Sequence, residues 1–133
     1  MTDATRPPTV SLYDRAGGMP FFEDLVARFY VGVADDDVLR PLYPEADLGP
    51  AQRRLTLFLA QYWGGPRTYD DERGHPRLRM RHAPFPIDAV ARDHWLTHMR
   101  AALAAVAPPA DVAAELDRYL EMAAEAMRNR ADD

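Results

Sequence analysis

The sequence predicts an all-α protein, because apolar residues recur at helical spacing along most of the chain and no stretch shows a two-residue alternation. Clusters of Gly and Pro separate the helical segments from one another. The 133 residues, 47% hydrophobic and 28% charged, have the size and composition of an ordinary globular domain. We therefore expect residues 1–9 to be a loose polar leader and residues 10–133 to form one domain.

The first two helices have clear start and stop signals. Ser11 and Asp14 have the spacing of a capping box, which predicts a short helix that ends at Gly17-Gly18. A longer helix is expected from Met19 to about Asp35, with Pro20 and two acids in its first turn. Its inward face should consist of Phe21, Phe22, Leu25, Val26, Phe29, Tyr30 and Val33.

A turn and a third long helix follow. The run Asp35-Asp36-Asp37 should end the preceding helix and cap a short turn through Val38, Leu39 and Leu42, which Tyr43-Pro44 closes. The next helix is expected from Pro50 to Trp63, because Gly64-Gly65-Pro66 stops it. Its inward residues should be Leu55, Phe58, Leu59 and Tyr62.

Residues 64–86 contain so many Gly and Pro residues that we expect only one short helix there, around Arg77 to His82. An irregular segment of about 20 residues is uncommon in a compact domain and usually has a function. The segment includes His82, which makes this histidine a candidate functional residue.

Two long helices complete the chain. The first should run from Ile87 to Val106, with Ile87, Ala91, Trp95, His98, Ala102 and Val106 facing inward. The second should begin after Pro108-Pro109 and end near Arg128, with Val112, Leu116, Tyr119, Leu120, Ala123 and Met127 facing inward.

Composition excludes several classes of function. The chain has no cysteine, so disulfides, iron–sulfur clusters and thiol catalysis are absent. All 16 basic residues are Arg, which excludes Lys-based Schiff bases, and the net charge of −5 argues against nucleic acid as a partner. No apolar run is long enough to cross a bilayer and the N-terminus lacks the apolar core of a secretory signal, so we expect a cytoplasmic protein without integral membrane association.

Two groups of side chains could bind a metal ion or a ligand, and each could instead have only a structural role. His94 and His98 are four residues apart on one helix and could share a metal ion, although no matching pair is evident on another helix. Tyr30, Tyr43 and Trp95 lie on or beside inward faces; they are either core residues or donors that converge on one cavity.

An ordered set of motifs over about residues 10–130 resembles the truncated haemoglobins, and within them the second group. The set comprises Tyr13-Asp14, Gly17-Gly18, Arg28-Phe29-Tyr30, Tyr43-Pro44, Phe58-Leu59, Gln61-Tyr62-Trp63-Gly64-Gly65-Pro66, Gly74-His75-Pro76, His82-Ala83-Pro84-Phe85, Asp93 and Trp95-Leu96. The resemblance implies a two-on-two helical sandwich around haem b, with His82 as the proximal iron ligand. A ligating histidine usually donates its other ring N–H to an acceptor, and we expect a backbone carbonyl of the preceding turn to fill that role.

The resemblance also implies roles for the other candidates. Tyr30, Tyr43 and Trp95 would be hydrogen-bond donors on the distal side of the haem. Residues expected to contact or cover the haem are Ala51, Leu55, Phe58 and Phe85, with Ala51 leaving an opening for diatomic ligands. The candidates to pair with the propionates are Arg54, Arg79 and Arg81.

These roles imply that the protein binds O₂, CO and NO. Two charge-assisted hydrogen bonds to bound O₂ would slow its release by about 10² or more, which makes the protein a poor carrier. Oxidation of NO and peroxidase-like turnover with peroxide are the expected reactions, and the first needs an electron-donating reductase. The alternatives are an oxygen or NO sensor or storage protein, and a cofactor-free interaction domain; the sequence leaves the oligomeric state open and is compatible with a homo-oligomer.

Overall fold

The computed structural model describes residues 10–130, so the expected leader at residues 1–9 lies outside the described residues. All of the regular secondary structure in this part of the chain is helical, and no strand occurs there. The helices are α2 (Leu12–Ala16), α3 (Met19–Ala34), the 3₁₀ turn η1 (Arg40–Leu42), α4 (Gly49–Tyr62), α5 (Thr68–Arg73), α6 (Leu78–His82), α7 (Ala89–Val106) and α8 (Ala110–Met127). The all-α prediction is therefore confirmed.

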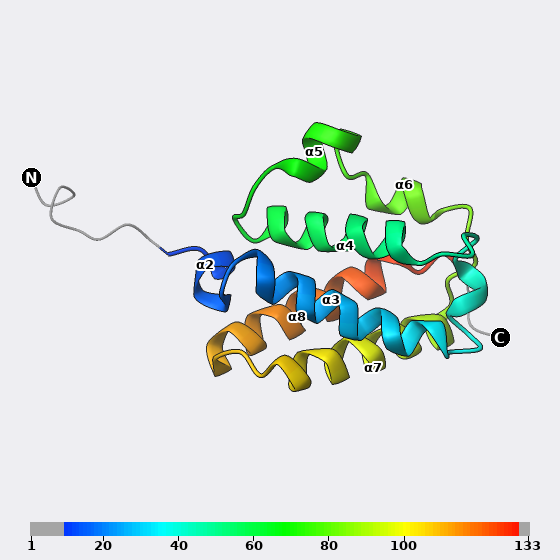
Figure 1. Cartoon of the computed structure of the whole chain (residues 1–133). Coiled ribbons are helices and arrows are strands. Elements are labelled where there is room, and N and C mark those ends of the chain that lie inside the picture. The colour runs from blue at the N-terminus through cyan, green and yellow to red at the C-terminus, as the bar shows by residue number, and fades with distance from the viewer. Residues whose placement is uncertain (1–9, 131–133) are drawn as a thin grey trace, which may run out of the picture.

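The four long helices form two layers. Helix α3 packs against both α4 and α7, and α8 packs against α7, so the pair α3 and α4 covers the pair α7 and α8 (Figure 1). This is the two-on-two sandwich that the resemblance implies. The short helices lie outside it, with α5 against α4 and α6 against α8. None of the helices within residues 10–130 is long and apolar enough to cross a membrane.

The helix ends follow the local sequence signals. The Ser11 side chain accepts a hydrogen bond from the Asp14 N–H, as the capping box predicts, and Gly17 ends α2 with a φ of 119°. Asp88 caps α7 by accepting from the Ala91 N–H, so α7 begins two residues later than Ile87, where we expected it. These caps satisfy N–H groups that have no partner within the helix.

The core lies mainly between α3, α7 and α8. On α3 the predicted inward residues are buried except for Phe21, which is half-buried. The prediction for α4 was wrong at Tyr62, which is 50% exposed and stacks on Tyr119 with ring centroids 4.2 Å apart. Helix α7 buries residues that the predicted stripe omitted, namely Leu96, Met99 and Leu103, because it packs against α3 and α8 at once.

The segment between α4 and α7 holds two short helices where we expected one. Helix α5 contains mostly polar residues and buries only Tyr69. Its position is set by a pair of hydrogen bonds from α4: Gln61 donates to the Asp70 carboxylate and accepts from the Asp70 N–H, each at 2.9 Å. Helix α6 follows Arg77, whose φ of 45° is left-handed, and ends at His82.

Candidate functional site

A cavity of about 490 Å³ lies between the two layers, and α6 forms part of its wall. The other lining residues come from α3, α4, α5, α7 and α8, from the turn that follows α3 and from the loop after α6. Most of the lining is apolar, and only a few polar groups converge on the space. This size and composition are typical of a site for a cofactor or small molecule.

His82 lies on the cavity wall and is half-buried at the C-terminal end of α6. Its Nδ1 is 2.7 Å from the carbonyl oxygen of Leu78, one turn earlier. This is the kind of acceptor that we expected for a ligating histidine. With Nδ1 donating to that carbonyl, the lone pair of Nε2 is available for a metal ion in the cavity.

The three predicted donors come from three parts of the chain and line the same cavity. Tyr30 is on α3, Tyr43 follows η1 and Trp95 is on α7. The two tyrosine rings meet edge to face with centroids 5.6 Å apart, and Trp95 packs on Phe29 at 5.3 Å. The structure therefore brings together the side chains that sequence spacing could not place relative to one another.

Tyr30 and Tyr43 lie close enough for each hydroxyl to influence the pKa of the other. Burial raises the pKa of Tyr30, and the neighbouring Tyr43 raises it further. Burial also raises the pKa of Tyr43, although Tyr30 opposes part of this rise. Both phenols therefore stay protonated at physiological pH and keep a hydroxyl proton that can be donated.

The apolar candidates also lie on the cavity wall. Ala51, Leu55 and Phe58 line it from α4, and Phe85 lines it from the loop after α6. Ala51 is only 4% exposed, so it does not open directly to solvent. Sequence reasoning did not select the lining residues Leu39, Leu42, Tyr69, Leu78, Ile87, Ala91, Tyr119, Leu120, Ala123 and Met127 as site residues, although several of them were expected to face inward.

The candidate arginines differ in their surroundings. Arg54 lines the cavity and pairs with Glu45 at 3.0 Å. Arg81 also lines it, but its guanidinium donates to the carbonyl oxygens of Pro76 and Arg73. Arg79 is exposed on α6 and is not among the cavity-lining residues.

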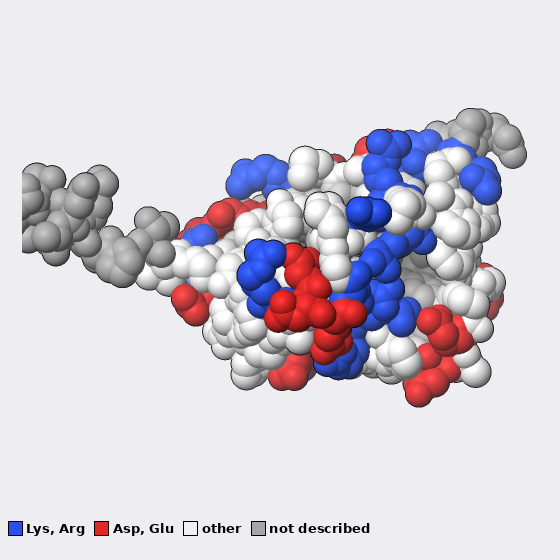
Figure 2. Space-filling view, turned by 90° about the horizontal axis from the view of Figure 1, so that it is seen from above, with Lys and Arg blue, Asp and Glu red and all other residues white. Residues whose placement is uncertain are grey.

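Sequence reasoning missed Arg73, which lines the cavity from the end of α5. Its guanidinium lies 5.9 Å from the centroid of the Tyr69 ring, and no carboxylate within residues 10–130 pairs with it. Figure 2 looks onto the face with α5 and α6 and shows Arg side chains gathered there beside a group of acidic ones. An anionic group of a bound ligand would find a counter-charge at this edge of the cavity.

His94 and His98 do not form the metal site that we considered. Both donate to the carboxylate of Asp36, with N–O distances of 2.9 and 2.6 Å. Among residues 10–130, no group of three or more His, Asp or Glu side chains could hold a metal ion. Asp36 also accepts hydrogen bonds from the N–H groups of Val38 and Leu39. The cluster therefore attaches the turn that leads to Tyr43 to α7. The two histidines that make this attachment lie on either side of Trp95 in the sequence.

The pKa of the Asp36 carboxyl lies well below its ordinary value. Burial acts to raise the pKa of its carboxyl, but the hydrogen bonds from His94, His98, Leu39 and Val38 together outweigh that effect and hold the pKa well below its ordinary value. The carboxylate therefore stays ionised at any physiological pH.

Comparison with known proteins agrees with this geometry. Residues 11–130 match the bacterial-like globin family. The group 2 truncated haemoglobin YjbI of Bacillus subtilis is 39% identical over 115 residues, which cover 86% of each chain. The solved structure of a thermostable haemoglobin from Thermobifida fusca is 60% identical with a TM-score of 0.89, covering 90% of this chain and 98% of that one. The solved structure of an oxygen-avid truncated haemoglobin from Bacillus subtilis is 38% identical with a TM-score of 0.85, covering 90% and 100%.

The two-layered helical sandwich with a histidine facing its cavity defines a globin, a protein that binds haem iron and small gas ligands such as O₂. More particularly, the chain belongs to the bacterial-like globin family and is a truncated haemoglobin of group 2. The residues present fit a haem: the cavity is largely apolar, His82 has a free Nε2 on one wall, and Arg73 at the rim can meet a carboxylate.

Proposed function

We propose that the protein binds haem b through His82, holds O₂ tightly with Tyr43 and Trp95 as donors, and uses it in redox chemistry. Haem supplies the ferrous iron that binds O₂, CO or NO and exchanges electrons with them. The absence of cysteine supports haem b, because thioether attachment of haem needs cysteine side chains. The similarity to a protein described as oxygen-avid supports tight binding.

The observation that carries the proposal is the pair of unused donors at the cavity wall. The Tyr43 hydroxyl lies on the cavity wall, and burial raises its pKa, so it keeps a proton that it can donate to a ligand. The indole N–H of Trp95 meets no protein acceptor within residues 10–130. Each such bond to a partly negative oxygen contributes about 1.5–3 kcal/mol.

Tyr30 has a supporting role in this proposal. It is 6% exposed and its ring packs against Phe29 with centroids 5.0 Å apart. Its ring also meets the Tyr43 ring edge to face with centroids 5.6 Å apart, which limits the positions that the Tyr43 side chain can take. The buried pair is therefore organised before a ligand arrives, which favours tight binding.

The apolar wall keeps bulk water from these donors. Leu55 and Phe58 lie on the cavity side of α4, and Phe58 packs against Tyr69 with ring centroids 5.6 Å apart. The small Ala51 leaves space inside the cavity, at the start of α4, for a bound diatomic ligand. In a site with little water, hydrogen bonds to the ligand are stronger than they would be in solvent.

We assign the haem propionates to Arg73 and Arg54. Arg73 has no carboxylate partner within the described residues, so it can pair without breaking an existing ion pair. Arg54 is held at the cavity by Glu45 and presents the remaining N–H groups of its guanidinium. Arg79 is less suited to this role because it lies outside the cavity wall.

Slow O₂ release favours a reaction at the haem over transport. In the reaction that we propose, NO and O₂ combine with one electron to give nitrate, and a reductase supplies that electron. With peroxide as oxidant, the same donors would polarise the O–O bond and support peroxidase-like turnover.

Rapid mixing tests the proposal. The O₂-loaded ferrous protein should convert NO to nitrate in one-to-one ratio within the mixing time, and should release O₂ at least about tenfold more slowly than the Trp95→Phe variant. Fast release of O₂ without nitrate would contradict the proposal and favour the sensor or storage alternative. Peroxide with an aromatic electron donor, followed by absorbance, tests the peroxidase branch separately.

A further inference from the structure

The chain beyond α8 returns to the loop that follows His82. Asn129, the only asparagine in the sequence, donates from Nδ2 to the carbonyl oxygens of His82 at 3.1 Å and Phe85 at 2.8 Å. Its Oδ1 accepts from the Ile87 N–H at 2.9 Å. The backbone N–H groups of Asn129 and Arg130 both donate to the Ile87 carbonyl oxygen. One residue thus contacts the loop at three positions.

The chemistry of these partners requires an amide side chain. Two of them are carbonyl oxygens, which need a donor, and the third is an N–H group, which needs an acceptor. An Asn side chain offers both on one rigid plane, and the partners determine which way the amide faces. An aspartate of the same shape would still accept from Ile87 but could not donate.

The loop has few hydrogen bonds of its own. Residues 83–87 include Pro84 and Pro86, which have no N–H to donate. Within the segment, the Ala83 N–H bonds to Met80 and the Phe85 N–H bonds to His82. The remaining bonds that hold it come from Asn129 and Arg130, so the position of the backbone at His82 depends on the end of α8.

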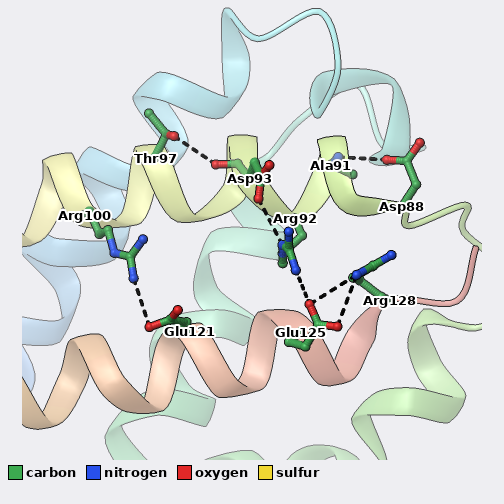
Figure 3. Close-up of polar contacts among 9 residues, drawn as sticks. All are labelled: Asp88, Ala91, Arg92, Asp93, Thr97, Arg100, Glu121, Glu125 and Arg128. Carbon is green, nitrogen blue, oxygen red and sulfur yellow. Dashed lines mark hydrogen bonds and ion pairs between the residues drawn. The ribbon is translucent and has the colours of Figure 1, made fainter. Parts of the chain in front are cut away.

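Ion pairs and packing hold the end of α8 in place. Figure 3 shows Glu125 between Arg92 of α7 and Arg128, with Arg92 also bonded to Asp93. Met127, at the last turn of α8, lines the same cavity as His82. Asn129 therefore extends from a helix end that is fixed to α7 and packed against the site.

We propose that Asn129 is a positioning residue for His82. It holds the backbone of the proximal histidine in place, while the Nδ1 bond to Leu78 orients the ring. Together the two contacts set the height and tilt of Nε2 toward the cavity. This inference rests on the proposed role of His82 as the iron ligand.

The test compares Asn129→Asp and Asn129→Ala with wild type and with a matched control, Arg130→Ala. The control removes the neighbouring side chain, whose hydrogen bonds within residues 10–130 go to Asn129, and keeps every bond from Asn129 to the loop. Two readouts are used: the iron–histidine stretching band in the resonance Raman spectrum of the dithionite-reduced protein, and the rate of haem transfer to excess apomyoglobin. The unfolding midpoint of the haem-free protein is followed in parallel.

Both Asn129 variants should shift or broaden the iron–histidine band and lose haem about tenfold faster, because the loop that carries His82 loses the two hydrogen bonds that Asn129 donates. Arg130→Ala should match wild type in both measurements. An unchanged band and transfer rate in both Asn129 variants would overturn the inference, even if the haem-free protein became less stable. Failure of the proposed function looks different: the iron–histidine band would be absent from wild type, or would survive in His82→Gly.

Discussion

Replacing Trp95 with Phe isolates the contribution of one hydrogen-bond donor. The phenyl ring can keep the edge-to-face contact with Phe29, which has a centroid distance of 5.3 Å, so the wall of the cavity changes little. The lost group is the indole N–H, which has no protein acceptor within the described residues. A charge-assisted hydrogen bond contributes about 1.5–3 kcal/mol, so O₂ should dissociate about 10 to 150 times faster.

Stopped-flow displacement of O₂ by CO measures this rate directly. Trp63→Phe is the matched control, because Trp63 is the other tryptophan and does not line the cavity. Its O₂ dissociation rate should stay within about twofold of wild type, a change well under 1 kcal/mol. Trp95→Leu should behave like Trp95→Phe. An unchanged rate in both Trp95 variants would show that this side chain is only a packing residue.

Three further predictions concern stability and haem retention. Asp36→Asn should lower the free energy of unfolding at pH 7 by about 2 kcal/mol, because two histidine donors and two backbone N–H groups lose a carboxylate. The carboxylate has a depressed pKa in the folded protein, so its stabilisation is present above about pH 4 and is lost as the pH falls further. Urea unfolding of both proteins at pH 7 and at pH 3 or below checks this, and a difference of equal size at both pH values would contradict it. Gly65→Ala should lower the free energy of unfolding by about 1–3 kcal/mol. A Cβ at this position would lie 2.6 Å from the Tyr13 ring and 2.8 Å from the Ala60 carbonyl oxygen. An unchanged melting temperature would refute this prediction. Arg73→Gln should speed haem transfer to apomyoglobin by about two- to fivefold, because the loss of an exposed ion pair costs less than about 1 kcal/mol. An unchanged transfer rate would show that Arg73 does not pair with a propionate.

The long helices could be predicted because their signals are local. Ser11 caps α2 as its spacing with Asp14 indicates, and Gly64 ends the turn after α4 with a φ of 104°. On α3 the apolar residues at helical spacing are the ones that the core buries. In each case the property that determines the structure lies within a few residues of the chain.

Helix α5 could not be predicted because its support is tertiary. The residues Thr68–Arg73 are mostly polar and have no apolar period. The hydrogen bonds between Gln61 and Asp70 fix the helix against α4, and nothing in the local sequence reveals that pairing. The same reason explains the role of Asp36, which is one of three adjacent aspartates and is distinguished only by the histidines of α7.

The site residues divide in a similar way. The motifs that resemble truncated haemoglobins include four of the site residues, namely Tyr30, Tyr43, His82 and Trp95. The structure brings all four to one cavity. The sequence could not show which arginines face the cavity. The orientation of a one-turn helix such as α6 depends on the left-handed backbone at Arg77. That orientation leaves Arg79 exposed and directs Arg81 to loop carbonyls.

The most direct test of the site is the absorption spectrum of wild type and His82→Gly after addition of haem, recorded before and after reduction with dithionite and then with CO. Wild type should show a Soret band that shifts on reduction and again with CO, as expected for iron held by one histidine with an open position opposite. His82→Gly should lose the five-coordinate ferrous spectrum and regain it when imidazole is added. A His82→Gly protein that binds haem with the wild-type spectrum, without imidazole, would contradict the assignment of His82 as the iron ligand.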